Sequence, residues 1–131
     1  MTLAGYIAWS VILFWVMIIF AFVIKEKGWS IEGMMHMFSN RETEMETSSF
    51  AGRAERSAKN MAENMILFGA AAVAAVAAGK MDGSVLTGAA IFFWARLVYW
   101  PVYLIGIPYL RTAVWVVSIY GILRMLLAVI G

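Results

Sequence analysis

The chain has 131 residues, of which 63% are hydrophobic and only 14% are charged. Soluble domains carry about a quarter charged residues, so this composition indicates an integral membrane protein. The lack of cysteine excludes disulfides, thiolate metal sites and a cysteine nucleophile. The single histidine leaves any metal site to carboxylates, which are poorly placed for one. The net charge of +2 is too small to indicate nucleic acid as a partner.

Four apolar segments are long enough to cross a bilayer, which takes about 20 helical residues. The first, Leu3–Ile24, contains no charged residue and lacks the basic start and cleavage site of a signal peptide. We therefore predict an all-α integral membrane protein, folded as one four-helix bundle over residues 1–131. The expected helices cover residues 3–24, 48–79, 84–106 and 111–130, with a loop over 25–47.

The distribution of basic residues predicts the orientation. Six of the ten lysines and arginines stand between the first and second membrane segments, whereas the next connection holds only Lys80. The positive-inside rule then places the first loop in the cytoplasm and both termini outside.

The first loop contains two further signals. Its segment from Lys25 to Ser39 is rich in aromatic and methionine residues, which is typical of the membrane interface or of a loop packed on its own helices. We expect His36 in this segment to be a surface residue. Ser39-Asn-Arg-Glu42 has the spacing of a capping box, so the second helix could begin there, with Glu42, Glu44 and Glu46 on its solvated face.

The second helix combines a polar stripe with a tail of small residues. At about 100° per residue, four polar side chains fall within about 80° of one another and form a stripe that enters the bilayer. They are Arg53, Arg56, Asn60 and Glu63. A carboxylate in a membrane is costly, so we expect Glu63 to have a partner or a ligand. The tail, Gly69–Gly79, favours close packing against other helices or other copies of the chain.

The third and fourth helices bring more polar groups to membrane depth. Arg96 falls near the expected bilayer midplane, and Tyr99 and Tyr103 follow on the same side of the helix. Arg111 stands at the cytoplasmic mouth of the fourth helix. Three helices thus send polar groups to the cytoplasmic half of the membrane.

Two interpretations of these groups remain open. In the first, Glu63 pairs with Arg96 or Arg56 in an internal ion-pair network. In the second, the cationic excess of four arginines over one acid binds a small zwitterion that carries more negative than positive charge.

Three motifs resemble the MAPEG family (membrane-associated proteins in eicosanoid and glutathione metabolism). They are Glu55-Arg56-x-x-x-Asn60-x-x-Glu63, Ala95-Arg96-x-x-Tyr99-x-x-x-Tyr103-Leu104 and Pro108-x-x-Arg111-x-x-x-Trp115. The resemblance covers essentially the whole chain and is weakest over residues 1–49.

The resemblance implies a homotrimer of four-helix subunits, with glutathione as cosubstrate between neighbouring subunits in the cytoplasmic half. Arg111 would be the catalytic residue, because its position matches the arginine that points at the sulfur in catalytic members. The residues implied in glutathione binding are Arg53, Arg56, Asn60, Glu63, Arg96, Tyr99 and Tyr103. Membrane lipids and a hydrophobic small-molecule substrate would be the other partners.

The sequence also departs from the pattern of the family that it resembles, because catalytic members from animals often have His and Asp where this sequence has Ala58 and Met61. Its short length and divergent motif favour a bacterial inner membrane, with the endoplasmic reticulum as the alternative. The leading hypothesis is a glutathione-dependent transferase or peroxidase acting on hydrophobic electrophiles or lipid hydroperoxides. The alternatives are a non-catalytic lipid-binding or scaffold protein of the same fold and an accessory subunit of a membrane complex.

Overall fold

The computed structural model describes residues 1–26, 30–38 and 48–131, and within them every regular element is an α-helix. Four of the helices are long and apolar enough to cross a membrane, which confirms the predicted all-α four-helix membrane fold. In chain order the helices are α1 (Leu3–Glu26), α2 (Ile31–Met37), α3 (Ser49–Ala77), α4 (Ser84–Ile105) and α5 (Pro108–Ile130).

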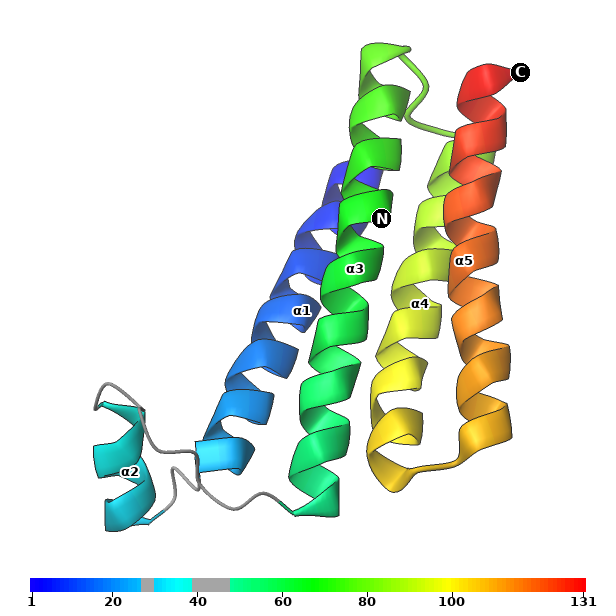
Figure 1. The fold of residues 1–131 in the computed structure, drawn as a ribbon. Helices are drawn as coiled ribbons and strands as arrows, with labels where there is room; N and C mark the ends of the chain where they lie inside the picture. The colour runs from blue at the N-terminus through cyan, green and yellow to red at the C-terminus, as the bar shows by residue number, and fades with distance from the viewer. Residues whose placement is uncertain (27–29, 39–47) are drawn as a thin grey trace.

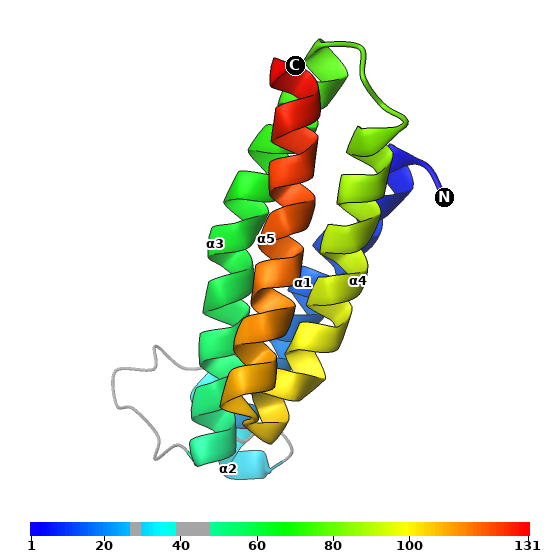
Figure 2. The same cartoon turned by 90° about the vertical axis from the view of Figure 1, so that its right-hand side faces the viewer.

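The four long helices stand side by side, and both chain ends lie toward the same end of the bundle (Figures 1 and 2). α3 and α4 each contact all three of the other long helices, so they form the middle of the bundle. We call the end where α4 turns into α5 the α4–α5 end, and the end where α3 turns into α4 the α3–α4 end.

The boundaries of α3 and α5 follow from local chemistry. α3 begins after Ser48, whose hydroxyl oxygen accepts a hydrogen bond from the Ala51 N–H at 3.1 Å, as an N-cap does. The capping box and acidic run expected over residues 39–46 lie outside the described residues. α5 begins at Pro108, three residues before the expected start, because proline suits the first helical turn, where its missing N–H is not needed.

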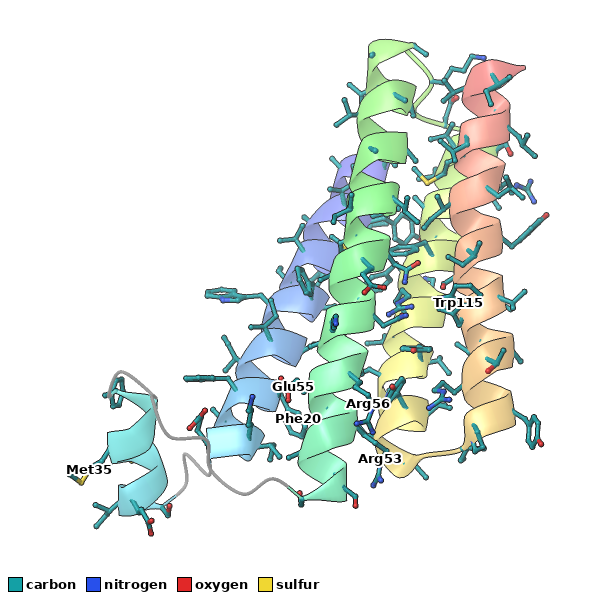
Figure 3. The ribbon with its side chains drawn as sticks, viewed as in Figure 1. Phe20, Met35, Arg53, Glu55, Arg56 and Trp115 are labelled. Atoms are coloured by element: carbon teal, nitrogen blue, oxygen red, sulfur yellow. The ribbon has the colours of Figure 1, made fainter. Side chains whose placement is uncertain are left out.

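The loop expected over residues 25–47 contains a short helix, α2, that the sequence did not predict. Its apolar side chains Ile31, Met34 and Met35 are exposed, as is Phe38 directly after the helix, and Met35 points away from the bundle (Figure 3). This exposure favours the membrane-interface interpretation over a loop packed on its own helices. The His36 side chain lies outside the described part of the chain.

The tightest helix contact joins α4 to α5 through Gly88 and Gly121. A Cβ atom added to Gly88 would lie 2.5 Å from the Gly121 carbonyl oxygen, and one added to Gly121 would lie 2.6 Å from the Gly88 carbonyl oxygen. Because both neighbours are backbone atoms, neither can rotate away. Small residues therefore let these two backbones touch, as is usual for helices packed within lipid.

Gly88→Ala is expected to destabilise the bundle by about 1–3 kcal/mol, because α4 and α5 must move apart to accept the methyl group. Unfolding in a denaturing-detergent titration measures the effect. The matched control is Gly69→Ala in α3, where an added Cβ meets nothing within 4 Å and the better helix propensity of alanine favours folding. Equal stability of the two variants would contradict the assigned contact.

Candidate ligand-binding site

A cavity of about 450 Å³ opens between α3, α4 and α5 in the half of the bundle nearest the α4–α5 end. Its volume lies in the range of small-molecule sites. Figure 3 labels Arg56 and Trp115, which mark its α3 and α5 walls. The lining residues are Arg56, Lys59, Asn60 and Glu63 from α3, Tyr99 and Tyr103 from α4, and Arg111, Thr112 and Trp115 from α5.

The α3 wall follows from helical spacing. Its four residues recur at intervals of three, one and three positions, which places them on one helix face. The buried face of the same segment carries small or apolar residues such as Ala54, Ala58 and Met61, which pack inside the bundle. The polar face is therefore the one left to line the cavity.

The cavity carries an excess of positive charge. Arg56, Lys59 and Arg111 contribute three positive charges and Glu63 contributes one negative charge, which leaves a formal net charge of +2. Among the described residues, neither Arg111 nor Glu63 forms a salt bridge. The described residues therefore do not form the ion pair of Glu63 with Arg96 or Arg56 that the first of the two open interpretations required. The site is electrostatically suited to an anion.

Tyr103, one of two neighbouring tyrosines on α4, holds Arg111 of α5 in place. The rings of Tyr99 and Tyr103 lie 5.5 Å apart with an interplanar angle of 59°, and both residues are buried. The Cζ atom of Arg111 lies 4.8 Å from the centre of the Tyr103 ring. Such a cation–π contact positions the guanidinium without using its N–H donors, so the fork stays free for a ligand.

The amide of Asn60 is also held from outside the cavity. The Nδ2 atom of Asn64, one turn further along α3, donates to the Asn60 carbonyl oxygen at 2.9 Å and to Asn60 Oδ1 at 3.1 Å. With its oxygen engaged, Asn60 keeps its own NH₂ group as a donor. Asn64 is therefore a supporting residue, which the sequence pattern did not predict.

Two of the eight residues expected in the site do not line the cavity. Arg53 donates from Nε to the Leu104 carbonyl oxygen at 2.9 Å, at the C-terminal end of α4 (Figure 3). Arg96 is fully buried, with Nε 3.2 Å from the Met61 sulfur and Cζ 4.1 Å from the centre of the Tyr99 ring. Its Nη1 and Nη2 atoms have no hydrogen-bond partner among the described residues. Arg96 thus supports the Tyr99 ring from behind the cavity wall.

We expect Arg53→Gln to lower stability without weakening ligand binding. The substitution removes a charged hydrogen bond to a helix C-terminus, a contact that contributes about 1 kcal/mol. Thermal unfolding in detergent and equilibrium dialysis with radiolabelled glutathione report the two effects separately. A loss of glutathione affinity of more than about tenfold would instead place Arg53 in the site, as the resemblance implies.

The other six predicted residues line the cavity, together with three that the prediction omitted from the site. Lys59 stands three positions after Arg56 and four before Glu63, so the helical spacing that marked its neighbours could have identified it. Thr112 and Trp115 follow Arg111 on α5. Within the residues that the structure describes, no three His, Cys, Asp or Glu side chains are grouped to hold a metal ion.

Comparison with known proteins places the whole chain in one family. The sequence model of the MAPEG family matches residues 2–131, and this range includes all four long helices and every residue of the cavity. No curated protein and no solved structure matches the chain. The match over essentially the full length confirms the resemblance carried by the three motifs. The chain belongs to the MAPEG family, whose membrane proteins are associated with glutathione and eicosanoid metabolism.

Proposed function

We propose that this protein is a membrane-bound glutathione transferase or peroxidase, which ionises the thiol of glutathione and directs the thiolate at an apolar electrophile or a lipid hydroperoxide. The observation that carries the proposal is the net charge of +2 in the cavity. Glutathione has two carboxylates and one ammonium group, so its net charge is −1 as the thiol and −2 as the thiolate. The cavity charge of +2 thus balances the charge of −2 on the thiolate form of glutathione.

Each polar lining residue has a partner on this ligand. Arg56 and Lys59 offer cationic donors to its carboxylates, Asn60 donates to a peptide or carboxylate oxygen, and Glu63 accepts from its ammonium group. Arg111, with its fork free, would lie at the sulfur. Tyr103 keeps Arg111 in place, and Trp115 contributes an apolar wall toward the second substrate.

Arg111 would act by electrostatics and not as a base, because a guanidinium does not deprotonate in proteins. A nearby positive charge lowers the pKa of a thiol and increases the fraction of thiolate, which is the nucleophile. The thiol proton leaves to water through the open mouth of the cavity.

With an electrophile, the sulfur lone pair forms the new S–C bond while the leaving group departs with its bonding pair. With a hydroperoxide, the thiolate attacks oxygen, the O–O bond breaks, and a second glutathione completes the reduction to alcohol, water and glutathione disulfide.

We also propose that three copies of the chain assemble around this site, as the family resemblance implies. Glu63 is exposed in the single chain, as are Ile66, Leu67 and Val73 further along the same helix. A neighbouring subunit packed on this face would cover the apolar side chains and close the cavity from the side.

The cytoplasm is the compartment we propose for the cavity. Of the eight basic residues that the structure describes, five lie toward the α4–α5 end: Lys25, Arg53, Arg56, Lys59 and Arg111. The positive-inside rule assigns the end with more basic residues to the cytoplasm. The cytoplasm is also the reducing compartment in which the glutathione pool is maintained.

Ultraviolet difference absorption tests the proposal directly. Titration of the purified protein with glutathione is expected to give a saturable thiolate band at neutral pH, whereas S-methylglutathione, which has no thiol, should bind without producing the band. Binding of glutathione with no thiolate band would refute an activating enzyme. No binding of either compound at millimolar concentration would refute the glutathione site and favour the non-catalytic lipid-binding alternative.

A further inference from the structure

We infer a second binding site, for the phosphodiester headgroup of an anionic phospholipid, at the α3–α4 end of the bundle. A cavity of about 410 Å³ opens there between α4 and α5. It is independent of the glutathione proposal, because none of its residues lines the first cavity. The lining residues are Ser84, Tyr120, Leu123, Arg124, Leu127 and Ala128.

The polar part of this cavity is a cluster of donors around Arg124. The Nε atom of Arg124 donates to Ser84 Oγ at 3.0 Å, and its Nη1 atom donates to Tyr120 Oη at 3.4 Å. Since both hydroxyl oxygens accept from Arg124, their hydrogens remain available to donate elsewhere. Two hydroxyl groups and the remaining guanidinium N–H groups thus form a set of donors to which the described part of the chain offers no acceptor, which is the chemistry of an anion site.

The protein supplies little negative charge near this cluster. Asp82 is the only acidic residue after Glu63 in the sequence, and among the described residues it forms no salt bridge with Arg124 or with Lys80. Lys80 lies at the same end and donates to the Ala128 carbonyl oxygen at 2.7 Å. An arginine near the end of a membrane helix that has no carboxylate partner among the described residues is available to an anion from the lipid headgroups.

The depth of Arg124 matches that of a lipid phosphate. Arg124 stands six positions before the last residue of α5, which places its backbone about 9 Å inside the end of the helix. Its guanidinium reaches Ser84, the first residue of α4, and therefore lies near the boundary between hydrocarbon and headgroups. A phosphodiester is the anion that a bilayer itself supplies at this depth, and Arg recognises phosphate well through its planar fork.

The apolar half of the cavity favours a lipid over a free phosphate ion. Leu123, Leu127 and Ala128 line the same space as the donors, so the ligand must present a charged end and an apolar body. A phospholipid has both, with the phosphate against Arg124 and the glycerol and acyl chain along α5.

Native mass spectrometry of the delipidated protein in detergent tests this site. Titration with phosphatidylglycerol is expected to show one tightly bound lipid per chain, with phosphatidylcholine weaker and inorganic phosphate without measurable binding. Arg124→Gln should weaken the phosphatidylglycerol affinity at least about tenfold, as expected for loss of a charged hydrogen bond. Lys25→Gln, which removes one positive charge at the other end of the bundle, should bind like the wild type.

A second variant tests the site independently if Arg124→Gln does not fold. The double change Ser84→Ala with Tyr120→Phe keeps the arginine charge but removes both hydroxyl donors, and it should weaken phosphatidylglycerol binding several-fold. Wild-type affinity in both variants would overturn the site. Inorganic phosphate binding as tightly as phosphatidylglycerol would overturn the lipid assignment and leave a site for free anions.

Discussion

Arg111→Ala is expected to abolish the thiolate band of bound glutathione and to lower turnover about 10²–10³-fold, the usual loss when one preorganised electrostatic group is removed from an active site. The guanidinium lies 4.8 Å from the Tyr103 ring and has no hydrogen bond or salt bridge from its side chain among the described residues. Its free donors therefore face the cavity. Without them, the pKa of the thiol returns toward the ordinary value for a cysteine-like thiol, about 8.5, and little thiolate forms at pH 7.

Two further variants separate this role from simple loss of charge. Arg111→Lys keeps the positive charge but not the planar fork, so it should retain a weakened band. Lys25→Gln removes a cation outside the cavity and should leave the band unchanged. S-methylglutathione affinity measures whether the binding site survives in each variant. A normal thiolate band in Arg111→Ala would remove the assigned role and direct attention to Arg56 or Lys59.

The four spanning helices were predictable because the bilayer imposes a length and a composition on each of them. Leu3–Ile24 has no charge, and the charged residues deep in the later spans are either buried (Arg96) or line a cavity (Glu63 and Arg124). No comparable constraint acts on α2. A helix of seven residues shows barely two turns of apolar spacing, and its exposed apolar side chains do not reveal their surroundings.

The lining of the cavity was predictable where helical spacing alone places a side chain. Arg56, Asn60 and Glu63 share a face of α3 whatever the rest of the fold does, and all three line the cavity. Helical spacing does not distinguish Arg53 from these three residues, because spacing gives the face of the helix and not the groups that face it. One turn before Arg56, the helix is already level with the end of α4, and Arg53 bonds to a carbonyl oxygen there.

Arg96 shows a second limit of reasoning from sequence. Depth and cost correctly indicate that a midplane arginine faces protein, and it is fully buried. Depth and cost do not indicate toward which neighbouring helix the Arg96 side chain points. The Met61 sulfur, at 3.2 Å, receives the Arg96 Nε contact. A thioether is a weak acceptor, and nothing in the spacing of the sequence indicates this partner.

Glu63→Gln is expected to reverse the ligand preference of the cavity. If the Glu63 carboxylate holds the ammonium group of glutathione, the neutral amide should weaken glutathione binding about tenfold or more, because it replaces a charge-assisted contact with a neutral one. The same change raises the net charge of the cavity from +2 to +3, since one negative charge is lost. Glutathione without its amino group, which carries a charge of −2, should therefore bind the variant as well as or better than it binds the wild type.

Isothermal titration of glutathione, and of glutathione without its amino group, into the wild type and into Glu63→Gln gives four affinities. Together they form a double cycle that isolates the interaction energy between the Glu63 carboxylate and the ligand's ammonium group. The matched control is Glu55→Gln, since Glu55 is an exposed carboxylate of the same helix that pairs with Lys25 at 3.2 Å and lies outside the cavity (Figure 3). It should leave both affinities unchanged. Equal losses for the two ligands in Glu63→Gln would show that Glu63 acts by holding the cavity wall, because only a direct contact can distinguish a ligand that has the ammonium group from one that lacks it.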